Sequence, residues 1–167
     1  GIWAYFLKKQ NDSDIDLNNL FSKFKNISGR GPDNINFSYN NDLFVTGFHR
    51  LSIMDTSING NQPFEYYHDG YTYICICNGE IYNAQSIRED ILNSSLNYTF
   101  TSLSDCEVLI PLYIQYGNNM MNILDGVFAF TIIAIDSKNN YTAFICRDRI
   151  GVRPLFIGKN NNNQNIG

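Results

Sequence analysis

The sequence has little charge, no paired cysteine motif and no long apolar run, and each shortage excludes a class of protein. Charged residues make up 17% of the 167 residues, and the net charge of −4 argues against a broad surface for nucleic acid or anionic membrane. No apolar stretch approaches the ~18 residues that a transmembrane helix needs. The four cysteines contain no CxxC pair of the zinc-binding type and form no dense disulfide framework. We therefore expect a reducing, cytoplasmic setting, without nucleic acid or membrane as partners.

What the sequence does contain is enough apolar material for one core. Hydrophobic residues make up 44% and aromatic residues 14% of the chain, a composition and length that suit a single globular domain. Asparagine is unusually common, with 24 residues, and alanine is rare, with 5. We attribute this skew in composition to A/T-rich codons. Residues 1–158 are expected to form the domain, and the Asn-rich residues 159–167 are expected to be a linker.

Hydrophobic periodicity predicts an α+β fold, with sheets packed against helices. The expected helices cover residues 17–24, 85–92, 104–116 and 120–124. The expected strands cover residues 1–7, 43–48, 51–54, 71–77, 127–135 and 141–147. Ser104 and Glu107 have the spacing of a capping box, and Pro111 is expected to kink the helix that follows. The last two strands read as a hairpin buried on both faces.

An asparagine and a glycine follow a strand-like run at the first place where chemistry is expected. The side-chain amide of Asn78 and the backbone N–H of Gly79 could together form a two-donor hole for an oxyanion, because glycine lets the backbone turn toward a ligand. The alternative is an ordinary Asn-Gly turn, which the dipeptide on its own favours.

Three further side chains are candidates, each with a plainer alternative. Arg50 stands between two strand-like runs, where a fixed guanidinium suits a carboxylate, although a surface ion pair is the usual outcome. Asp105 could bind an ammonium group or could simply cap a helix. Cys106 lies near an expected helix N-terminus, where thiolates are stabilised, but no histidine is close to it in the sequence. His49 is expected to be structural.

Seven motifs occur in the order that is typical of one known family. They are Gly1–Ala4, Arg30–Asp33, Phe48–Ile53, Asn78–Asn83, Ser104–Glu107, Leu124–Phe130 and Arg147–Leu155. Together they resemble the glutamine amidotransferase type 2 domain at the N-terminus of glutamine-dependent asparagine synthetases, from residue 1 to about residue 158. Asn-Gly-Glu-Ile-Tyr-Asn and Arg-Asp-x-x-Gly-Val-Arg-Pro-Leu are the most specific motifs, and Arg-Leu-Ser-Ile favours the asparagine synthetase branch.

The resemblance implies a fold and a set of site residues. The fold would be that of the N-terminal nucleophile hydrolases, a four-layer αββα sandwich of two antiparallel sheets. Arg50 would bind the α-carboxylate of L-glutamine, while Glu80 and Asp105 would hold its α-ammonium. Asn78 and Gly79 would donate hydrogen bonds to the oxyanion. The pocket would be lined by the backbone of Leu51, Ser52, Ile53 and Met54.

The family's nucleophile is an N-terminal cysteine, and we expect that cysteine immediately before Gly1. The implied activity is hydrolysis of glutamine to glutamate and ammonia, which a C-terminal synthetase domain of the same polypeptide would use to amidate aspartate. ATP and magnesium would bind in that domain only, and no metal or cofactor is expected here. A homodimer is compatible with the sequence, which does not decide the oligomeric state.

Two alternatives remain open at this stage. One is a glutamine-binding or scaffold domain that lacks its nucleophile and has no activity. The other is the glutaminase domain of a different amidotransferase, one that makes glucosamine phosphate or a purine precursor.

Overall fold

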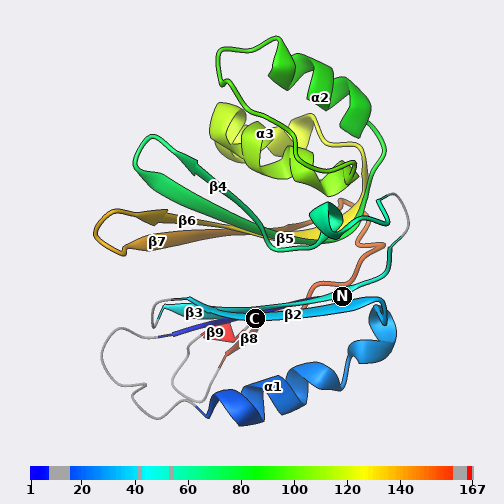
Figure 1. The fold of residues 1–167 in the computed structure, drawn as a ribbon, viewed down its shortest axis with the longest axis vertical. Coiled ribbons are helices and arrows are strands. Elements are labelled where there is room, and N and C mark those ends of the chain that lie inside the picture. Colours follow the sequence, from blue (N-terminus) through cyan, green and yellow to red (C-terminus); the bar gives the residue numbers. More distant parts are fainter. Residues whose placement is uncertain (8–15, 41–42, 53–54, 160–164, 167) are drawn as a thin grey trace. The chain divides into compact units, whose positions relative to one another are not determined.

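In the computed structural model, the described residues form two larger antiparallel sheets, a short two-stranded one, and helices (Figure 1). It describes residues 1–7, 16–40, 43–52, 55–159 and 165–166. The chain divides into two compact units: unit 1 comprises Gly1–Ser52 and Phe156–Gly167, and unit 2 comprises Ile53–Leu155. Each unit has its own sheet and its own helices. The predicted α+β class is therefore confirmed.

Unit 1 is a three-stranded antiparallel sheet, in the order β1-β3-β2, with one helix packed on it. Its elements are β1 (Ile2–Phe6), α1 (Leu17–Lys25), the 3-10 helix η1 (Ser28–Arg30), β2 (Asn34–Asn40) and β3 (Phe44–Arg50). The carboxylate of Asp16 caps α1 by accepting a hydrogen bond from the backbone N–H of Asn19. A short pair, β8 (Gly158–Lys159) with β9 (Asn165–Ile166), also belongs to this unit.

Phe24 fixes α1 to the sheet of unit 1. Its ring is fully buried and lies 4.0 Å from the ring of His49 and 5.6 Å from that of Phe37, measured between centroids. It also covers Gly47, where a Cβ atom would approach the Phe24 ring to 2.6 Å. The Nε2 atom of His49 lies 3.0 Å from the carbonyl oxygen of Phe24. His49 is thus structural, as predicted, and its side chain belongs to the face of the sheet that carries α1.

Unit 2 is a four-stranded antiparallel sheet, in the order β4-β5-β6-β7, with helices packed on one face (Figure 1). Its strands are β4 (Phe64–His68), β5 (Tyr71–Ile81), β6 (Gly126–Asp136) and β7 (Tyr141–Arg147). Its helices are the 3-10 helix η2 (Ile58–Gly60), α2 (Ala84–Leu92), the 3-10 helix η3 (Asp105–Val108), α3 (Leu109–Tyr116) and the 3-10 helix η4 (Gly117–Asn122).

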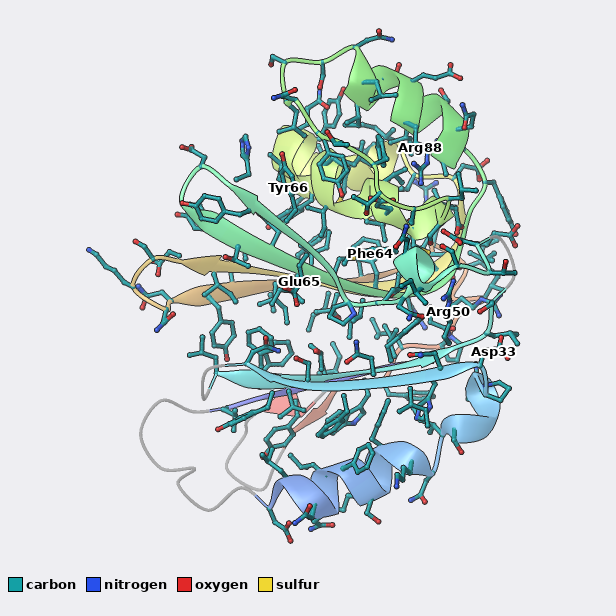
Figure 2. All side chains as sticks on the ribbon, viewed as in Figure 1. Asp33, Arg50, Phe64, Glu65, Tyr66 and Arg88 are labelled. Carbon is teal, nitrogen blue, oxygen red and sulfur yellow. The ribbon has the colours of Figure 1, made fainter. Side chains whose placement is uncertain are left out.

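The apolar core of unit 2 lies between this sheet and its helices. Strand β4 shows the alternation that produces it: Phe64 and Tyr66 point to the helix side and Glu65 to the opposite side (Figure 2). The fully buried side chains of the core include Ile87, Leu109, Leu112, Phe130 and Ile132. Among the described residues, no helix has the length and apolar composition needed to cross a membrane.

Several predicted details are wrong. Ser104 makes no side-chain cap, so the predicted capping box is absent, and Asp105–Val108 form a 3-10 turn before α3 begins. Pro111 occupies the first turn of α3, where its missing N–H needs no partner, so no kink is required. The helix predicted over residues 120–124 is instead the 3-10 helix η4, which covers Gly117–Asn122. Strand β7 is a partly exposed edge strand, whereas β6 is buried as predicted.

Of the strand predicted over 51–54, Leu51 and Ser52 lie outside any strand, and Ile53 and Met54 lie outside the described residues.

Candidate active site

Arg50, the predicted carboxylate clamp, is the last residue of β3 in unit 1 and is 6% exposed. The backbone of Asp33 donates a hydrogen bond to the carbonyl oxygen of Arg50 (3.0 Å), and the carboxylate of Asp33 accepts one from the N–H of Ser52 (2.7 Å). Figure 2 shows Asp33 and Arg50 at the same end of this sheet. Gly31 lies so close that a Cβ atom there would collide with the carbonyl of His49. The Arg30–Asp33 motif therefore fixes the backbone on both sides of Arg50.

The residues after Arg50 were predicted to line the pocket. Leu51 is 57% exposed and Ser52 is half-buried. Ile53 and Met54 lie outside the described residues.

The β1–β3 ladder continues up to the first residue of the chain. Gly1 donates to the carbonyl oxygen of His49 (2.6 Å) and accepts from its N–H (2.8 Å), so the two form a hydrogen-bonded pair that extends the Ile2–Phe48 register. Continued by one position beyond Gly1, this register would fall opposite Arg50. Because Gly1 and His49 form a hydrogen-bonded pair, the next pair would be of the non-hydrogen-bonded kind, in which the two Cα atoms are roughly 4.5 Å apart and both side chains lie on one face.

Asn78, Gly79 and Glu80 lie in unit 2, inside the second half of β5. They pair with Ala129, Phe128 and Val127 of β6. The ordinary Asn-Gly turn considered above is therefore wrong. A Cβ atom at position 79 would collide with the carbonyl of Val127, so glycine is needed there to let β6 approach. Asn78 is half-buried and Glu80 is exposed.

Asp105, the first residue of η3, is linked directly to this end of β5. Its Oδ2 atom accepts a hydrogen bond from the backbone N–H of Ile81 at 2.6 Å. The structure thus ties Asp105 to the backbone of the residue that follows Glu80, the other carboxylate predicted to hold an ammonium group. The Sγ atom of Cys106 lies 3.9 Å from the carbonyl oxygen of Gly79, a second link between η3 and β5.

Cys106 itself is excluded as a reactive thiolate. A hydrogen bond with Cys77 and full burial raise the pKa of the Cys106 thiol well above its ordinary value. A thiol of this kind is inert at neutral pH. The position of Cys106 near a helix start favoured a stabilised thiolate, but its hydrogen bond with Cys77 and its burial have the opposite effect on its pKa.

The sequence reasoning did not assign a role to Asp148, which organises the last motif. Its carboxylate accepts hydrogen bonds from the backbone N–H groups of Gly151 (2.6 Å), Val152 (2.9 Å), Arg153 (3.0 Å) and Phe128 (3.3 Å). Burial on its own would raise the pKa of Asp148, but these donors outweigh it and lower the pKa to about 2. Since Phe128 is the β6 partner of Gly79, Asp148 holds β6 at the level of the predicted oxyanion donors.

The predicted site residues therefore fall into two groups. Arg50, Leu51 and Ser52 belong to unit 1, while Asn78–Glu80 and Asp105 belong to unit 2. Among the residues that the structure describes, no cluster of three or more His, Cys, Asp or Glu side chains is placed to hold a metal ion.

Arg50 ends β3 of unit 1, whereas in unit 2 the Asn-Gly pair and Glu80 lie within β5 and Asp105 begins η3. A family model described as "Glutamine amidotransferase domain" matches residues 1–166, and the chain belongs to that family.

The similar curated proteins include several asparagine synthetases. The chain is 36% identical over 148 residues to the glutamine-hydrolysing asparagine synthetase of Sandersonia aurantiaca, an alignment that covers 88% of this chain and 26% of that protein. It is 37% identical over 150 residues to a probable asparagine synthetase of Acanthamoeba polyphaga mimivirus, covering 87% and 25%. It is 39% identical over 130 residues to asparagine synthetase 1 of Bacillus subtilis, covering 78% and 19%. The resemblance found in the sequence is confirmed, and the alignments span only 19–26% of the length of these relatives.

Solved structures of amidotransferases share the fold. The glutamine phosphoribosylpyrophosphate amidotransferase of B. subtilis matches with a TM-score of 0.54 and 25% identity, over 69% of this chain and 25% of that one. The allosteric regulatory enzyme of purine biosynthesis matches with a TM-score of 0.57 and 23% identity, over 70% and 26%. The prediction of an α+β fold of the N-terminal nucleophile hydrolase type is thereby confirmed.

Proposed function

We propose that this domain hydrolyses L-glutamine to L-glutamate and ammonia, as the glutaminase part of an asparagine synthetase. The ammonia passes to a C-terminal synthetase domain of the same polypeptide, which uses ATP and magnesium to amidate aspartate. The glutaminase step itself needs no metal or cofactor, and the protein works in the cytoplasm. The three asparagine synthetases named above, each matched over more than three quarters of this chain, support this assignment.

The nucleophile in this proposal is a cysteine directly before Gly1. Its thiolate attacks the side-chain amide carbon of glutamine, and its own α-amine, with an ordinary pKa of ~7.7–8.0, takes up the thiol proton and delivers it to the leaving ammonia. The C–N bond breaks and a thioester forms. Water then attacks the thioester, which releases glutamate and restores the thiol.

One observation carries the proposal: the β1–β3 register. Because Gly1 pairs with His49, a cysteine before Gly1 lies opposite Arg50, with both side chains on the same face of the sheet. Arg50 binds the α-carboxylate of glutamine there, and the backbone of Leu51 and Ser52 lines the pocket. The attacking sulfur and the carboxylate clamp are thus neighbours across one strand pair.

The groups that bind the remaining charges of glutamine come from unit 2. Glu80 and Asp105 hold the α-ammonium; the hydrogen bond from Ile81, which ties Asp105 to the residue after Glu80, supports this. Asn78 and Gly79 donate to the oxyanion of the tetrahedral intermediate, where one such donor contributes roughly 2.7–4 kcal/mol.

The decisive experiment uses the full-length protein with cysteine before Gly1. We expect glutamate release from glutamine, and we expect it to vanish when that cysteine is replaced by alanine, while glutamine binding, measured by calorimetry, persists. Release that survives the alanine substitution would refute the mechanism. Glutamine binding without any release, in the protein that carries the cysteine, would instead support the inactive binding domain.

A separate assay tests whether aspartate is the substrate that accepts the ammonia. Asparagine formation from aspartate, glutamine and ATP supports the asparagine synthetase assignment. Glutamate release without asparagine formation would favour a different amidotransferase.

A further inference from the structure

The segment that leads into Asp105 is held by polar side chains rather than by regular secondary structure. Residues 101–104 lie between α2 and η3 and form neither helix nor strand. Their backbone is bound by three side chains of unit 2: Glu107, Arg88 and Asp55. No apolar packing explains this arrangement, because Leu103 is 78% exposed. The hydrogen bonds therefore set the path of the chain just before Asp105.

Glu107 is the centre of this network and is only 1% exposed. Its Oε1 atom accepts from the N–H (2.7 Å) and the hydroxyl (3.0 Å) of Thr101. Its Oε2 atom accepts from the N–H (2.8 Å) and the hydroxyl (2.6 Å) of Ser102. With four donors on two oxygens, the carboxylate is fully satisfied, which is what a buried charge requires.

Two contacts carry this arrangement forward to Ser104, the residue before Asp105. The hydroxyl of Ser102, which donates to Glu107, also accepts from the N–H of Ser104 at 3.1 Å. Arg88, on α2 (Figure 2), donates through Nη2 to the carbonyl oxygens of Ser104 (2.6 Å) and Ser102 (3.1 Å). The same nitrogen lies 3.7 Å from Oε2 of Glu107, so its positive charge offsets the buried carboxylate.

The network ends at the carboxylate of Asp105. Asp105 follows Ser104 directly, and its Oδ2 atom is tied to the N–H of Ile81. On one side its backbone is fixed through Ser104 and Ser102, and on the other its side chain is fixed to β5. Its position relative to Glu80 thus depends on Glu107.

We propose that Glu107 is a positioning residue for substrate recognition: by way of Ser102 and Ser104 it holds Asp105 where the carboxylate can bind the α-ammonium of glutamine. This inference rests on the proposed function, because it assumes that Asp105 binds an ammonium. It goes further by naming a buried residue that touches no substrate and sets the preference for a free amino acid over an analogue without the amino group.

The test compares two substrates that differ only in the ammonium group. Glutaramate is glutamine without its α-amino group, so it cannot use Asp105. In the full-length protein carrying the nucleophilic cysteine, we expect Glu107→Gln to raise KM for glutamine about tenfold, which is about 1.4 kcal/mol, with kcat little changed. We expect kcat/KM for glutaramate to be the same in wild type and variant.

Four variants accompany this measurement. Glu89→Gln makes the same substitution at an exposed glutamate of α2 and should leave kcat/KM unchanged for both glutamine and glutaramate. Asp105→Asn should show the same selectivity as Glu107→Gln, and the double variant should be no worse than Asp105→Asn alone, because the two residues act in series. Ser102→Ala removes only the relay hydroxyl, and it decides the question if Glu107→Gln does not fold.

Different outcomes separate the possible failures. An equal loss of kcat/KM for both substrates would show that Glu107 is merely structural, and no loss for either would show that it does not position Asp105. A wild type that treats both substrates alike would overturn the ammonium site together with this inference. A wild type without glutaminase activity would refute the proposed function alone, and the same comparison of variants would then be made on the calorimetric Kd values of the two ligands.

Discussion

At the scale of single residues, Arg50 shows what residue chemistry can predict and what it cannot. An arginine between two strand-like runs in a chain with few charges indicated a carboxylate clamp, and the structure places it at the end of β3. That Asp33 binds the carbonyl oxygen of Arg50 and the N–H of Ser52 could not be predicted, because these contacts join the residue before β2 to the end of β3 and the loop after it. The spacing of Glu107 from Ser104 fits a capping box, but the partners of its carboxylate are the nearby Thr101 and Ser102.

Replacing Arg50 by alanine tests the clamp. We expect Arg50→Ala to raise KM for glutamine at least about tenfold, since a charge-assisted hydrogen bond contributes roughly 1.5–3 kcal/mol, with a smaller effect on kcat. Steady-state glutamate release by the full-length protein measures this. Arg149→Ala, at an exposed arginine, is the control and should leave KM as it is. An unchanged KM in Arg50→Ala would remove the clamp from the mechanism.

Asp148 allows a prediction about pH. Its pKa in the folded protein, about 2, lies below the ordinary value of 3.8, so the folded state binds this proton less readily than the unfolded chain. The carboxylate therefore contributes stability above pH 4, and this contribution is lost as the pH falls toward 2. We expect Asp148→Asn to lower the melting temperature at pH 7, and the difference from wild type to shrink as the pH falls from 4 to 2.

The matched control for that experiment is Asp90→Asn, at an exposed aspartate of α2. It should change the melting temperature little at any pH. A difference between Asp148→Asn and wild type that stays constant down to pH 2 would mean that the ionised carboxylate does not hold the loop.

At the scale of elements, the helices and strands with strong apolar periodicity were predicted, and those with weak periodicity were missed. Strands β6 and β7 and helices α1 and α2 match the expected ranges within a few residues. Strand β2 was missed because Ile35, Phe37 and Tyr39 alternate with asparagines and a serine, which have low strand propensity. Strand β5 runs four residues further than predicted, because pairing with β6 overrides the turn preference of Asn78 and Gly79.

The contact between α1 and β3 can be tested at Gly47. A Cβ atom there would meet the ring of Phe24, which is buried and stacked on His49 and so has little room to move. We expect Gly47→Ala to lower the free energy of unfolding by about 1–3 kcal/mol, as overpacking does. Urea unfolding followed by the fluorescence of Trp3, the only tryptophan of the chain, reports on this contact.

Gly29→Ala is the control for this substitution. Nothing lies within 4 Å of a Cβ atom at that position, so the change should stay within about 0.5 kcal/mol of wild type. Equal stabilities of the two variants would show that the Phe24 contact is not tight.

At the scale of the whole molecule, the two reactions of the proposed synthetase should respond differently to metal removal. Cysteine chemistry at the glutaminase site needs no metal, whereas ATP-dependent amidation requires magnesium. We expect EDTA to abolish asparagine formation by the full-length protein and to leave glutamate release intact. Added magnesium should restore the product. A parallel loss of both reactions would place a metal requirement in the glutaminase step.

The pairing of Gly1 with His49 has a practical consequence for handling the protein. A slip of β1 by a single residue would turn the proposed cysteine to the face that carries α1, so the proposed activity would report directly on strand register. An affinity tag or an uncleaved initiator methionine ahead of the cysteine would block the amine while leaving every packing contact of the sheet in place. Such a preparation would have a normal melting temperature but no glutaminase activity. Affinity tags for purification therefore belong at the C-terminus.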